Sequence, residues 1–528
     1  MTVLRNPVIR GFAPDPSLVR VGDWYYVATS SFEWFPTIPI HRSRDLAHWQ
    51  YAGHVRGAVP GDSLAGVPDS GGVWAPSLSW DGERFWMVYS VVRSVGTPYF
   101  DLDTYVCTAT DVSGTWSAPR RVASHGFDPA LFHHEGRLWL LNMQSDHRPG
   151  GRRFAGIVLT ELDRRTLAPS GATHLLLQHE RLIEGPKLVH RDGWYHLVLA
   201  EGGTGVEHGV LVARSRAITG PYELDRQPLL TTRDDPSVPL QKAGHAELVQ
   251  TPDGDWVMSH LAARPLRTAQ GPRCPLGRET AVQALTWDED GWPRLRDGGW
   301  HPAVEVDVPT RRQELAAAAD TGEPLGWPWS TLREPADPSW ADTVARPGWI
   351  RLRGRHGPES WWAHSLLAQR ITEHRAEAEV TVEARPRTFT QAAGLVLWYN
   401  TEAYHALDLT WAEPEGAGQH GQQWEGGGRT VLSLVEREEG ATRTAAVVEV
   451  DADSPLTLGV TVDGVEARFW YVREGVRTPV GPPLDFGKLS DDHGSRLRFT
   501  GAMAGVHAVD LVDGAFTADF TGFRLTCW

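Results

Sequence analysis

Short runs of alternating apolar and polar residues, separated by glycine turns, fill most of this 528-residue chain. Alternation with a period of two over four to eight residues is typical of half-buried β-strands. Asp-Gly pairs at 81–82, 192–193, 253–254 and 290–291 mark hairpin turns between such runs. No long amphipathic helix is visible. The pattern therefore predicts an all-β protein.

One sequence motif recurs five times in the first half of the chain. Each copy has a short polar or Pro-containing run that ends in leucine, then a Gly turn, then an aromatic-rich strand. The leucines are Leu18, Leu78, Leu131, Leu188 and Leu248, at steps of 60, 53, 57 and 60 residues. Repeats of this length built from short strands are typical of propeller blades. We therefore expect a five-bladed β-propeller over residues 1–308.

The repeat is lost beyond residue 308. Residues 309–339 are rich in Gly and Pro and are expected to form a linker, with one or two helical turns in 313–319. Strands without the repeat then resume, at 350–353, 376–384, 393–399, 406–411, 430–435, 444–450, 456–462, 465–472 and 519–525. This set predicts a lectin-like antiparallel β-sandwich over residues 340–528.

The residue at the head of the repeat varies from copy to copy, with aspartate in two of the five. These head residues are Asp15, Trp74, Asp128, Glu184 and His245. Radial repetition brings equivalent positions to one central mouth, so three carboxyls, an aromatic ring and an imidazole should converge there. Asp-Pro pairs are common in turns, but Ala75 stands where the two aspartates stand, so the turn itself needs no acid.

Glu184 differs from the two aspartates in its surroundings. It follows the apolar pair Leu182-Ile183, so its carboxyl should be partly desolvated and its pKa raised, as a proton donor at neutral pH requires. Glycoside hydrolysis requires at least two separated carboxyl groups of unlike pKa, one that donates a proton and one that accepts a proton. The third carboxyl would orient the donor or hold its pKa through like-charge repulsion.

Composition narrows the function classes. A net charge of −15 without any basic run argues against a nucleic-acid partner. No apolar run is long enough to span a membrane, and the first residues lack the apolar core of a secretory signal. Three cysteines far apart in sequence indicate neither a disulfide framework nor a metal site. We therefore expect a cytoplasmic protein without a membrane partner.

The ordered motifs also resemble a known family. Motifs at 6–17, 31–36, 72–76, 127–129, 184–186, 200–204 and 277–280 are similar to glycoside hydrolase family 43, above all to its β-xylosidase branch. The similarity continues through 353–356, 391–396 and 518–520, in the pattern of that branch's C-terminal sandwich. The resemblance implies a five-bladed propeller and single-displacement hydrolysis with inversion, in which the two carboxyls are about 6.5–9.5 Å apart.

The resemblance also implies roles for particular residues. Asp15 resembles the general base, Glu184 the general acid, and Asp128 the residue that positions Glu184 and tunes its pKa. Arg278 resembles a hydroxyl-binding arginine, while Phe32 and Trp74 resemble walls of the terminal-sugar pocket. His245 resembles a central histidine that in some relatives lies near a water or a divalent ion. No cofactor is expected to be required, and a divalent cation near His245 is the one candidate.

Some positions depart from the family pattern. Ser145 stands where a tryptophan is usual, and Met503 replaces a phenylalanine that reaches toward the pocket from the sandwich. Ser77 and Lys187 stand where histidines are common. None of these changes removes a catalytic carboxyl, so the expected reaction is unaffected. The preference for a particular aglycone stays open. Relatives of this branch often form homodimers or homotetramers, and the oligomeric state of this chain stays open.

We therefore expect an exo-acting glycosidase that removes terminal β-D-xylose from xylo-oligosaccharides. An α-L-arabinofuranosidase, or an enzyme that acts on both sugars in arabinose-bearing oligosaccharides, remains open. A non-catalytic carbohydrate-binding protein would present five similar sites, whereas the five head residues are dissimilar. A retaining enzyme acting on fructosides would begin with Asn-Asp-Pro-Asn, which is absent here.

Overall fold

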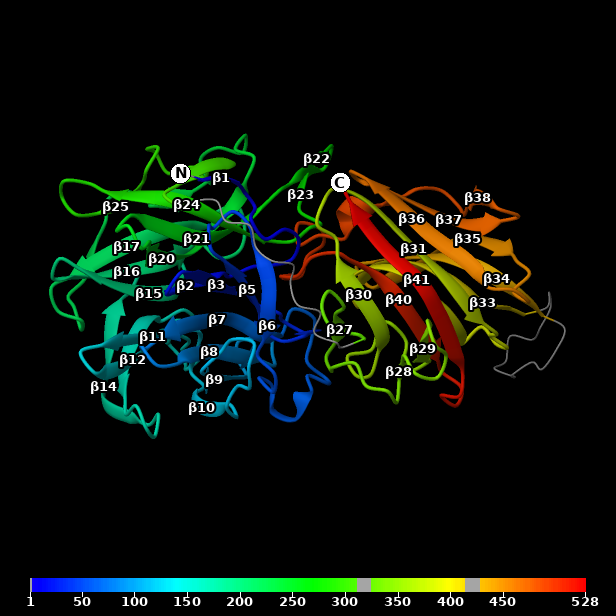
Figure 1. The fold of residues 1–528 in the computed structure, drawn as a ribbon, viewed down its shortest axis with the longest axis horizontal. Coiled ribbons are helices and arrows are strands. Elements are labelled where there is room, and N and C mark those ends of the chain that lie inside the picture. Colours follow the sequence, from blue (N-terminus) through cyan, green and yellow to red (C-terminus); the bar gives the residue numbers. More distant parts are fainter. Residues whose placement is uncertain (1, 311–323, 414–427) are drawn as a thin grey trace. The chain divides into compact units, whose positions relative to one another are not determined.

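The computed structural model describes residues 2–310, 324–413 and 428–528, and the chain divides into two compact units (Figure 1). The first unit comprises 1–62, 70–265 and 278–319, and the second comprises 63–69, 266–277 and 320–528. The only helical elements in the described part are two 3₁₀ turns, η1 (Pro60–Asp62) and η2 (Phe486–Lys488). The all-β prediction is thereby confirmed. The helical turns expected at 313–319 lie outside the described residues.

Five antiparallel sheets form the blades of the first unit (Figure 1). Their strands in chain order are β2 (Ser17–Val21), β3 (Trp24–Ala28), β5 (Pro39–Ser43) and β6 (Gln50–His54); β7 (Gly72–Trp80), β8 (Phe85–Val92), β9 (Leu102–Ala109) and β10 (Arg120–Ala123); β11 (Gly126–His134), β12 (Arg137–Gln144), β13 (Gly156–Leu162) and β14 (Pro169–Leu177); β15 (Ile183–Arg191), β16 (Trp194–Glu201), β17 (Gly209–Ser215), β18 (Glu223–Leu224) and β19 (Leu230–Thr231); and β20 (Gln241–Gln250), β21 (Trp256–Ala263), β24 (Glu279–Trp287) and β25 (Pro293–Leu295).

The first strand of each blade contains one repeat leucine, and these five strands contact one another in a closed ring. This ring is the five-bladed propeller that the repeat predicts. The N-terminal segment helps to close it, because β1 (Thr2–Arg5) pairs with β26 (Glu305–Val308). Asn6 then exchanges two hydrogen bonds of 2.8 Å with the backbone of Val282 in the fifth blade.

The blades are held together by apolar packing between neighbouring sheets. Strand β8 is buried at all eight of its positions. Trp86 and Val88 of this strand pack in one cluster with Leu131 and Leu138 of the next blade. Burying each large apolar side chain contributes about 1.5–3 kcal/mol, so blade stacking is the main source of stability for the ring.

The second unit is a sandwich of two antiparallel sheets (Figure 1). One sheet contains β28 (Ala341–Asp342), β29 (Ile350–Arg353), β41 (Thr517–Cys527), β31 (Arg375–Ala384), β36 (Leu456–Asp463), β37 (Glu466–Arg473), β38 (Val476–Pro479) and β39 (Leu484–Asp485). The other contains β30 (Ser365–Arg370), β40 (Met503–Asp510), β32 (Gln391–Asn400), β33 (Ala403–Ala412), β34 (Arg429–Glu438) and β35 (Ala441–Glu449). The hairpin of β22 (Leu266–Thr268) and β23 (Gly271–Arg273) also belongs to this unit.

Each of the nine strand segments expected in the sandwich overlaps an observed strand. Strand β31 shows why, since its buried and partly exposed positions alternate along most of its length. Two strands of the second sheet, β30 and β40, were not predicted. All eight positions of β40 are buried, so this strand has no polar face to give the alternating signal.

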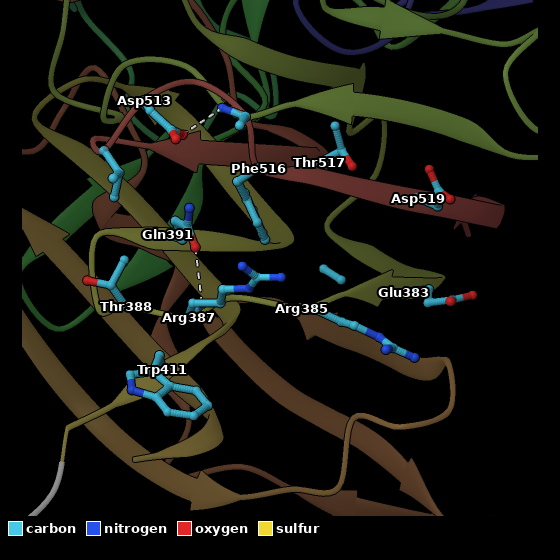
Figure 2. A pocket seen from close by; sticks show the side chains of 13 residues that line it. Glu383, Arg385, Arg387, Thr388, Gln391, Trp411, Asp513, Phe516, Thr517 and Asp519 are labelled. Atoms are coloured by element: carbon cyan, nitrogen blue, oxygen red, sulfur yellow. Dashed lines mark hydrogen bonds between the residues drawn. The ribbon is translucent and has the colours of Figure 1, made fainter. Parts of the chain in front are cut away.

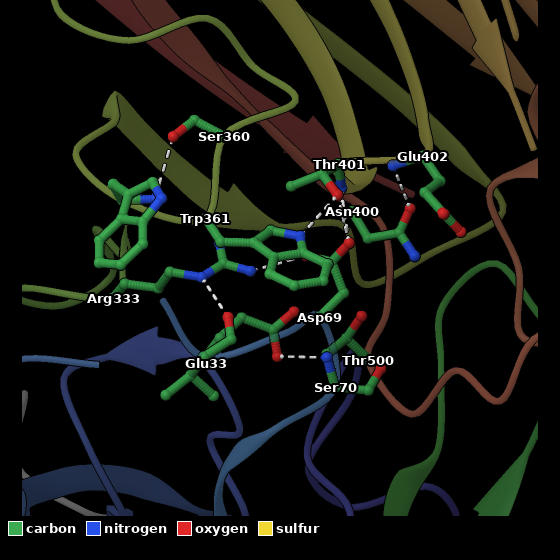
Figure 3. Close-up of polar contacts among 12 residues, drawn as sticks. Glu33, Asp69, Ser70, Arg333, Ser360, Trp361, Asn400, Thr401, Glu402 and Thr500 are labelled. Atoms are coloured by element: carbon green, nitrogen blue, oxygen red, sulfur yellow. Dashed lines mark hydrogen bonds and ion pairs between the residues drawn. The ribbon is translucent and has the colours of Figure 1, made fainter. Parts of the chain in front are cut away.

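A segment distant in sequence completes the second unit. Arg333 is fully buried, and its guanidinium contacts Asp69 Oδ1 at 2.8 Å and the carbonyl of Val67 at 2.8 Å. The backbone N–H of Thr401 donates to Asp69 Oδ2 at 3.1 Å (Figure 3). Residues 63–69 therefore group with the sandwich, although they follow the first blade in the chain.

Among the described residues, no helix has both the length and the apolar character needed to cross a membrane.

Candidate active site

The propeller repeats one unusual backbone conformation at the heads of its blades. Asp15, Ala75, Asp128, Gly185 and His245 lie three residues before the repeat leucines, and their φ angles are 55°, 34°, 52°, 56° and 51°. In four blades the ladder register shifts across this position, as in a β-bulge. A left-handed residue in a bulge turns its side chain away from the regular alternation, and it costs about 1–2 kcal/mol for a residue other than glycine. The fold therefore places these side chains by a shared strained turn.

Asp15 is buried and held by three partners. Its Oδ2 accepts a hydrogen bond from Ser30 Oγ at 2.6 Å, while its Oδ1 lies 3.4 Å from Arg278 Nη1 and 3.5 Å from His245 Nδ1. Burial raises the pKa of Asp15, but Arg278, His245 and the Ser30 hydrogen bond outweigh it and hold this pKa below its ordinary 3.8. Asp15 is therefore a carboxylate at neutral pH. Ser30 was not predicted from the sequence.

The carboxyls of Asp128 and Glu184 both have raised pKa values, in contrast to Asp15. Burial, together with the negative charge of Asp15, raises the pKa of Glu184 to about 7 against the lowering effect of Arg278. Burial and the charges of Glu184 and Asp15 also raise the pKa of Asp128 well above 3.8. Asp128 Oδ2 accepts a hydrogen bond from the backbone N–H of Gly185 at 3.0 Å, so it is fixed against the residue that follows Glu184.

The structure thus brings the three predicted carboxyls together and buries each of them. The pair formed by Asp128 and Glu184 retains a proton near neutral pH, while Asp15 has lost its own. Such an arrangement offers a base on one residue and an acid on another, as general acid–base hydrolysis requires.

Arg278 is buried, and its backbone also positions the base. The N–H of Ala13 donates to the Arg278 carbonyl at 3.0 Å, which fixes the segment that leads to Asp15. The neighbouring Glu279 binds Arg264 at 2.7 and 2.8 Å and accepts from the N–H of Gly11 at 2.6 Å. These contacts fix the predicted sugar-binding arginine beside the predicted base.

Two neutral histidines lie behind Asp15. Burial lowers the pKa of His245 to about 4 and that of His208 to about 3. A side chain added at Gly185 would come within 3.1 Å of the His245 ring, and one at Gly244 within 2.1 Å of the His208 ring. Both imidazoles are therefore tightly enclosed. His208 was not predicted because it lies outside the repeat.

The divalent cation expected near His245 has little support from protein ligands. In the described part of the chain, the one group of three or more His, Cys or carboxylate donors close enough to share an ion is Cys274, Asp491 and Asp492, in the second unit. His245 is not a member of this group. The cation stays a prediction, and no chemical step is derived through it.

Four aromatic rings form a row, and Phe127 at one end directly precedes Asp128 in the chain. Phe32 and Trp74 are 6.1 Å apart between ring centroids, and Phe12 and Phe127 extend the row at 5.9 and 5.7 Å. Gly72 allows this approach, because a side chain there would lie 2.1 Å from the carbonyl oxygen of Phe32. Phe32 and Trp74 thus lie in ring contact, and their role as walls of a sugar pocket stays a prediction. Phe12 and Phe127 were not predicted.

Ser145 and Met503 are not linked to the carboxyls by any described contact. Ser145 directly follows β12, and its N–H donates to the His125 carbonyl at 2.8 Å. Met503 is the first residue of β40, fully buried in the second unit and opposite Arg370 and Trp398 in the ladders. Their roles in leaving-group selection stay predictions.

A second polar layer occupies the positions one residue before the repeat leucines. Lys187 Nζ donates to Ser77 Oγ at 2.7 Å and lies 3.5 Å from Glu247 Oε2, which also accepts from Ser17 Oγ at 2.6 Å. These four side chains connect the first, second, fourth and fifth blades. The buried Lys187 ammonium also acts electrostatically on Asp128 and His245. These polar contacts thus hold together the blades that carry the site residues.

Comparisons with known proteins agree with this geometry. Residues 4–293 match the model of glycosyl hydrolases family 43, and residues 321–526 match that of the beta xylosidase C-terminal Concanavalin A-like domain. The chain is 38% identical to the Xylosidase/arabinosidase 43B of Humicola insolens over 99% of this chain and 97% of that protein. It is 36% identical to the Beta-xylosidase of Bacillus subtilis over 99% of both chains. The crystal structure of xylan beta-1,4-xylosidase from Bacillus Halodurans C-125 superposes with a TM-score of 0.93 at 39% identity, covering 99% of this chain and 100% of that one.

Proposed function

Because the chain belongs to glycosyl hydrolases family 43 and is a glycosidase, we propose that it removes terminal β-D-xylose from xylo-oligosaccharides as an exo-acting, inverting enzyme. The observation that carries this proposal is the unlike ionisation of two neighbouring buried carboxyls. The pKa of Asp15 is lowered and that of Glu184 is raised to about 7.

In the proposed mechanism, Asp15 removes a proton from a water molecule as that water attacks the anomeric carbon. Glu184 donates its proton to the departing glycosidic oxygen, so the bond to the aglycone breaks in the same step. Asp128 positions the donor by accepting a hydrogen bond from the Gly185 N–H, while burial and the negative charge of Asp15 keep the Glu184 pKa high. Phe32 and Trp74 offer apolar faces to the sugar ring, and Arg278 offers donors to its hydroxyls.

The names of the relatives support xylose as the terminal sugar, since those reported above are all named for xylosidase activity. The Humicola relative is also named as an arabinosidase, so an α-L-arabinofuranoside is the competing substrate to be measured. The ratio of kcat/KM on nitrophenyl β-D-xyloside and nitrophenyl α-L-arabinofuranoside decides between them. We expect the xyloside to be preferred.

Time-resolved NMR of xylobiose hydrolysis tests the proposed reaction directly. An inverting enzyme releases α-xylose first from a β-linked substrate, and mutarotation forms the β anomer only later. Replacing Glu184 with Gln should depress the rate by orders of magnitude, and least for substrates with good leaving groups. Glu207→Gln, at an exposed glutamate on the same unit, is the matched control. Initial release of β-xylose, or full activity of Glu184→Gln on xylobiose, would refute the mechanism.

We also propose that the enzyme acts in the cytoplasm on imported oligosaccharides. In support, Cys107, Cys274 and Cys527 are free thiols, which suit a reducing compartment. Cell fractionation followed by an activity assay tests this location. The oligomeric state stays open, and light scattering after size-exclusion chromatography would measure it.

A further inference from the structure

The sandwich contains a cavity of about 790 Å³ that is built entirely from residues of the second unit (Figure 2). It is lined by the loop 385–390 between β31 and β32, the loop 511–516 between β40 and β41, the strand ends that flank these loops, and the end of β33. Its volume lies within the range of about 300–1,000 Å³ that is usual for small-molecule sites. None of the residues of the candidate active site lines it.

Two of the three carboxylates that line this cavity are paired with arginines. Glu383 binds Arg346 at 2.8 Å, and Asp519 binds Arg351 at 2.7 Å. Asp513 accepts a hydrogen bond of 2.9 Å from a backbone N–H within its own turn. Two of the three negative charges at the cavity wall are therefore compensated by arginines, and the third, on Asp513, is exposed to solvent.

Two lining cations are not compensated in this way. Arg385 and Arg387 are exposed residues of the loop 385–390, and within the described part of the chain neither guanidinium forms an ion pair. A planar guanidinium binds a carboxylate through two parallel hydrogen bonds, and two such groups on one wall favour an anionic ligand. The ionic character of the cavity therefore selects for a carboxylate.

The same cavity offers apolar surface. The rings of Trp411 and Phe516 line it, from β33 and the loop 511–516 (Figure 2). On the loop 511–516, the lining residue Val512 is 40% exposed and the preceding Leu511 is 60% exposed. Exposed large apolar groups that border a pocket are typical of binding surfaces, and an aromatic face suits the C–H face of a sugar ring.

The two loops are fixed before any ligand binds. The buried Gln391 accepts a hydrogen bond from the Arg387 N–H at 3.0 Å and donates to Asp510 Oδ1 at 3.3 Å. Asp510 Oδ2 in turn accepts from the Phe516 N–H at 2.9 Å. A site held in this way loses little conformational entropy on binding, which favours affinity.

We propose that this cavity binds a saccharide that carries a carboxylate, namely a uronic acid residue. Arg385 and Arg387 would hold the carboxylate, Trp411 would contact the ring, and Thr388 and Thr517 would meet its hydroxyls. A simple inorganic anion would leave the aromatic surface unused, and a neutral sugar would leave both arginines without a counter-charge. This binding activity is separate from the proposed hydrolysis, since the cavity shares no residue with the carboxyl site.

The test uses two probes that differ in one group. Methyl glucuronide and methyl glucoside are titrated against the full chain at constant ionic strength, with saturation-transfer NMR as the readout. Neither probe presents a terminal pentose, so the hydrolytic site does not dominate the signal. We expect the glucuronide to bind at least about tenfold more tightly than the glucoside, which corresponds to one charge-assisted hydrogen-bonded pair.

Three variants complete the test. Arg385→Ala combined with Arg387→Ala should abolish the preference for the glucuronide, and Trp411→Ala should weaken the binding of both probes. Arg468→Ala is the matched control, because Arg468 is 60% exposed on the same unit and paired with Glu466. All variants should keep the wild-type rate on nitrophenyl xyloside, which also reports that they are folded. Equal binding of both probes, an unchanged preference in the double variant, or displacement of the glucuronide by an equal concentration of acetate would overturn the proposal.

Discussion

Replacing the proposed proton donor should make this protein more stable while it becomes less active. Burial and the charge of Asp15 raise the pKa of Glu184 from its ordinary 4.5 to about 7. The folded protein therefore holds a proton that the unfolded chain releases between these two pH values. The stability gained from this proton is complete below pH 4.5 and is lost as the pH rises through 7. The amide introduced by Glu184→Gln would stay neutral at every pH.

The magnitude follows from the same values. The interval from 4.5 to about 7, at about 1.4 kcal/mol per pH unit, corresponds to about 3 kcal/mol. Glu184→Gln should thus exceed the wild type in unfolding free energy by about 3 kcal/mol at pH 8. At pH 5 the same difference should shrink to about 1 kcal/mol or less, because both proteins are then largely neutral at this position.

Thermal unfolding followed at pH 5, 6, 7 and 8 measures this effect. The Tm of Glu184→Gln should rise above that of the wild type by several degrees at pH 8, with the gap closing toward pH 5. Glu207→Gln, at a glutamate that is 57% exposed, should match the wild type throughout. A difference that is independent of pH, or a variant less stable than the wild type at pH 8, would contradict a buried, proton-holding Glu184.

Asp15→Asn should lower kcat/KM by about 10²–10⁴ on nitrophenyl xyloside and xylobiose alike, because the attacking water needs its base whichever leaving group departs. Recovery on the nitrophenyl substrate alone would oppose this role. The pH profile on xylobiose should fall above about pH 7 as Glu184 loses its proton, and on the acid side only below pH 3.8, where Asp15 gains one. Ser30→Ala removes a hydrogen bond to Asp15 and should move the acid limb toward neutral pH, and an unmoved limb would show that Ser30 does not tune the base. Lys187→Met should reduce the free energy of unfolding in urea by about 3 kcal/mol, because it leaves Glu247 without its buried partner. Adding Glu247→Gln should restore most of this loss, and no restoration would mean that the two residues do not act as a pair.

The sequence could indicate the blades and their head residues because both depend on local patterns. Each repeat leucine lies in the first strand of its blade, and the spacing alone gave the number of sheets. The apolar residues before Glu184 similarly indicated a raised pKa, since burial is its largest cause. Strands β30 and β40 had no such signal, because in a strand buried on both faces polar and apolar positions do not alternate.

The chain by itself determined which chemical groups are present at each blade head and how far apart they stand along the sequence. Only the tertiary structure decided which groups meet across blades. Ser30 meets Asp15 within the first blade, where β2 pairs with β3. His208 and His245, from the fourth and fifth blades, act on Asp15 because five strands close into a ring. The pKa difference between Asp15 and Glu184 arises from these contacts, because charge interactions depend on distance in space and on burial, which no linear spacing contains.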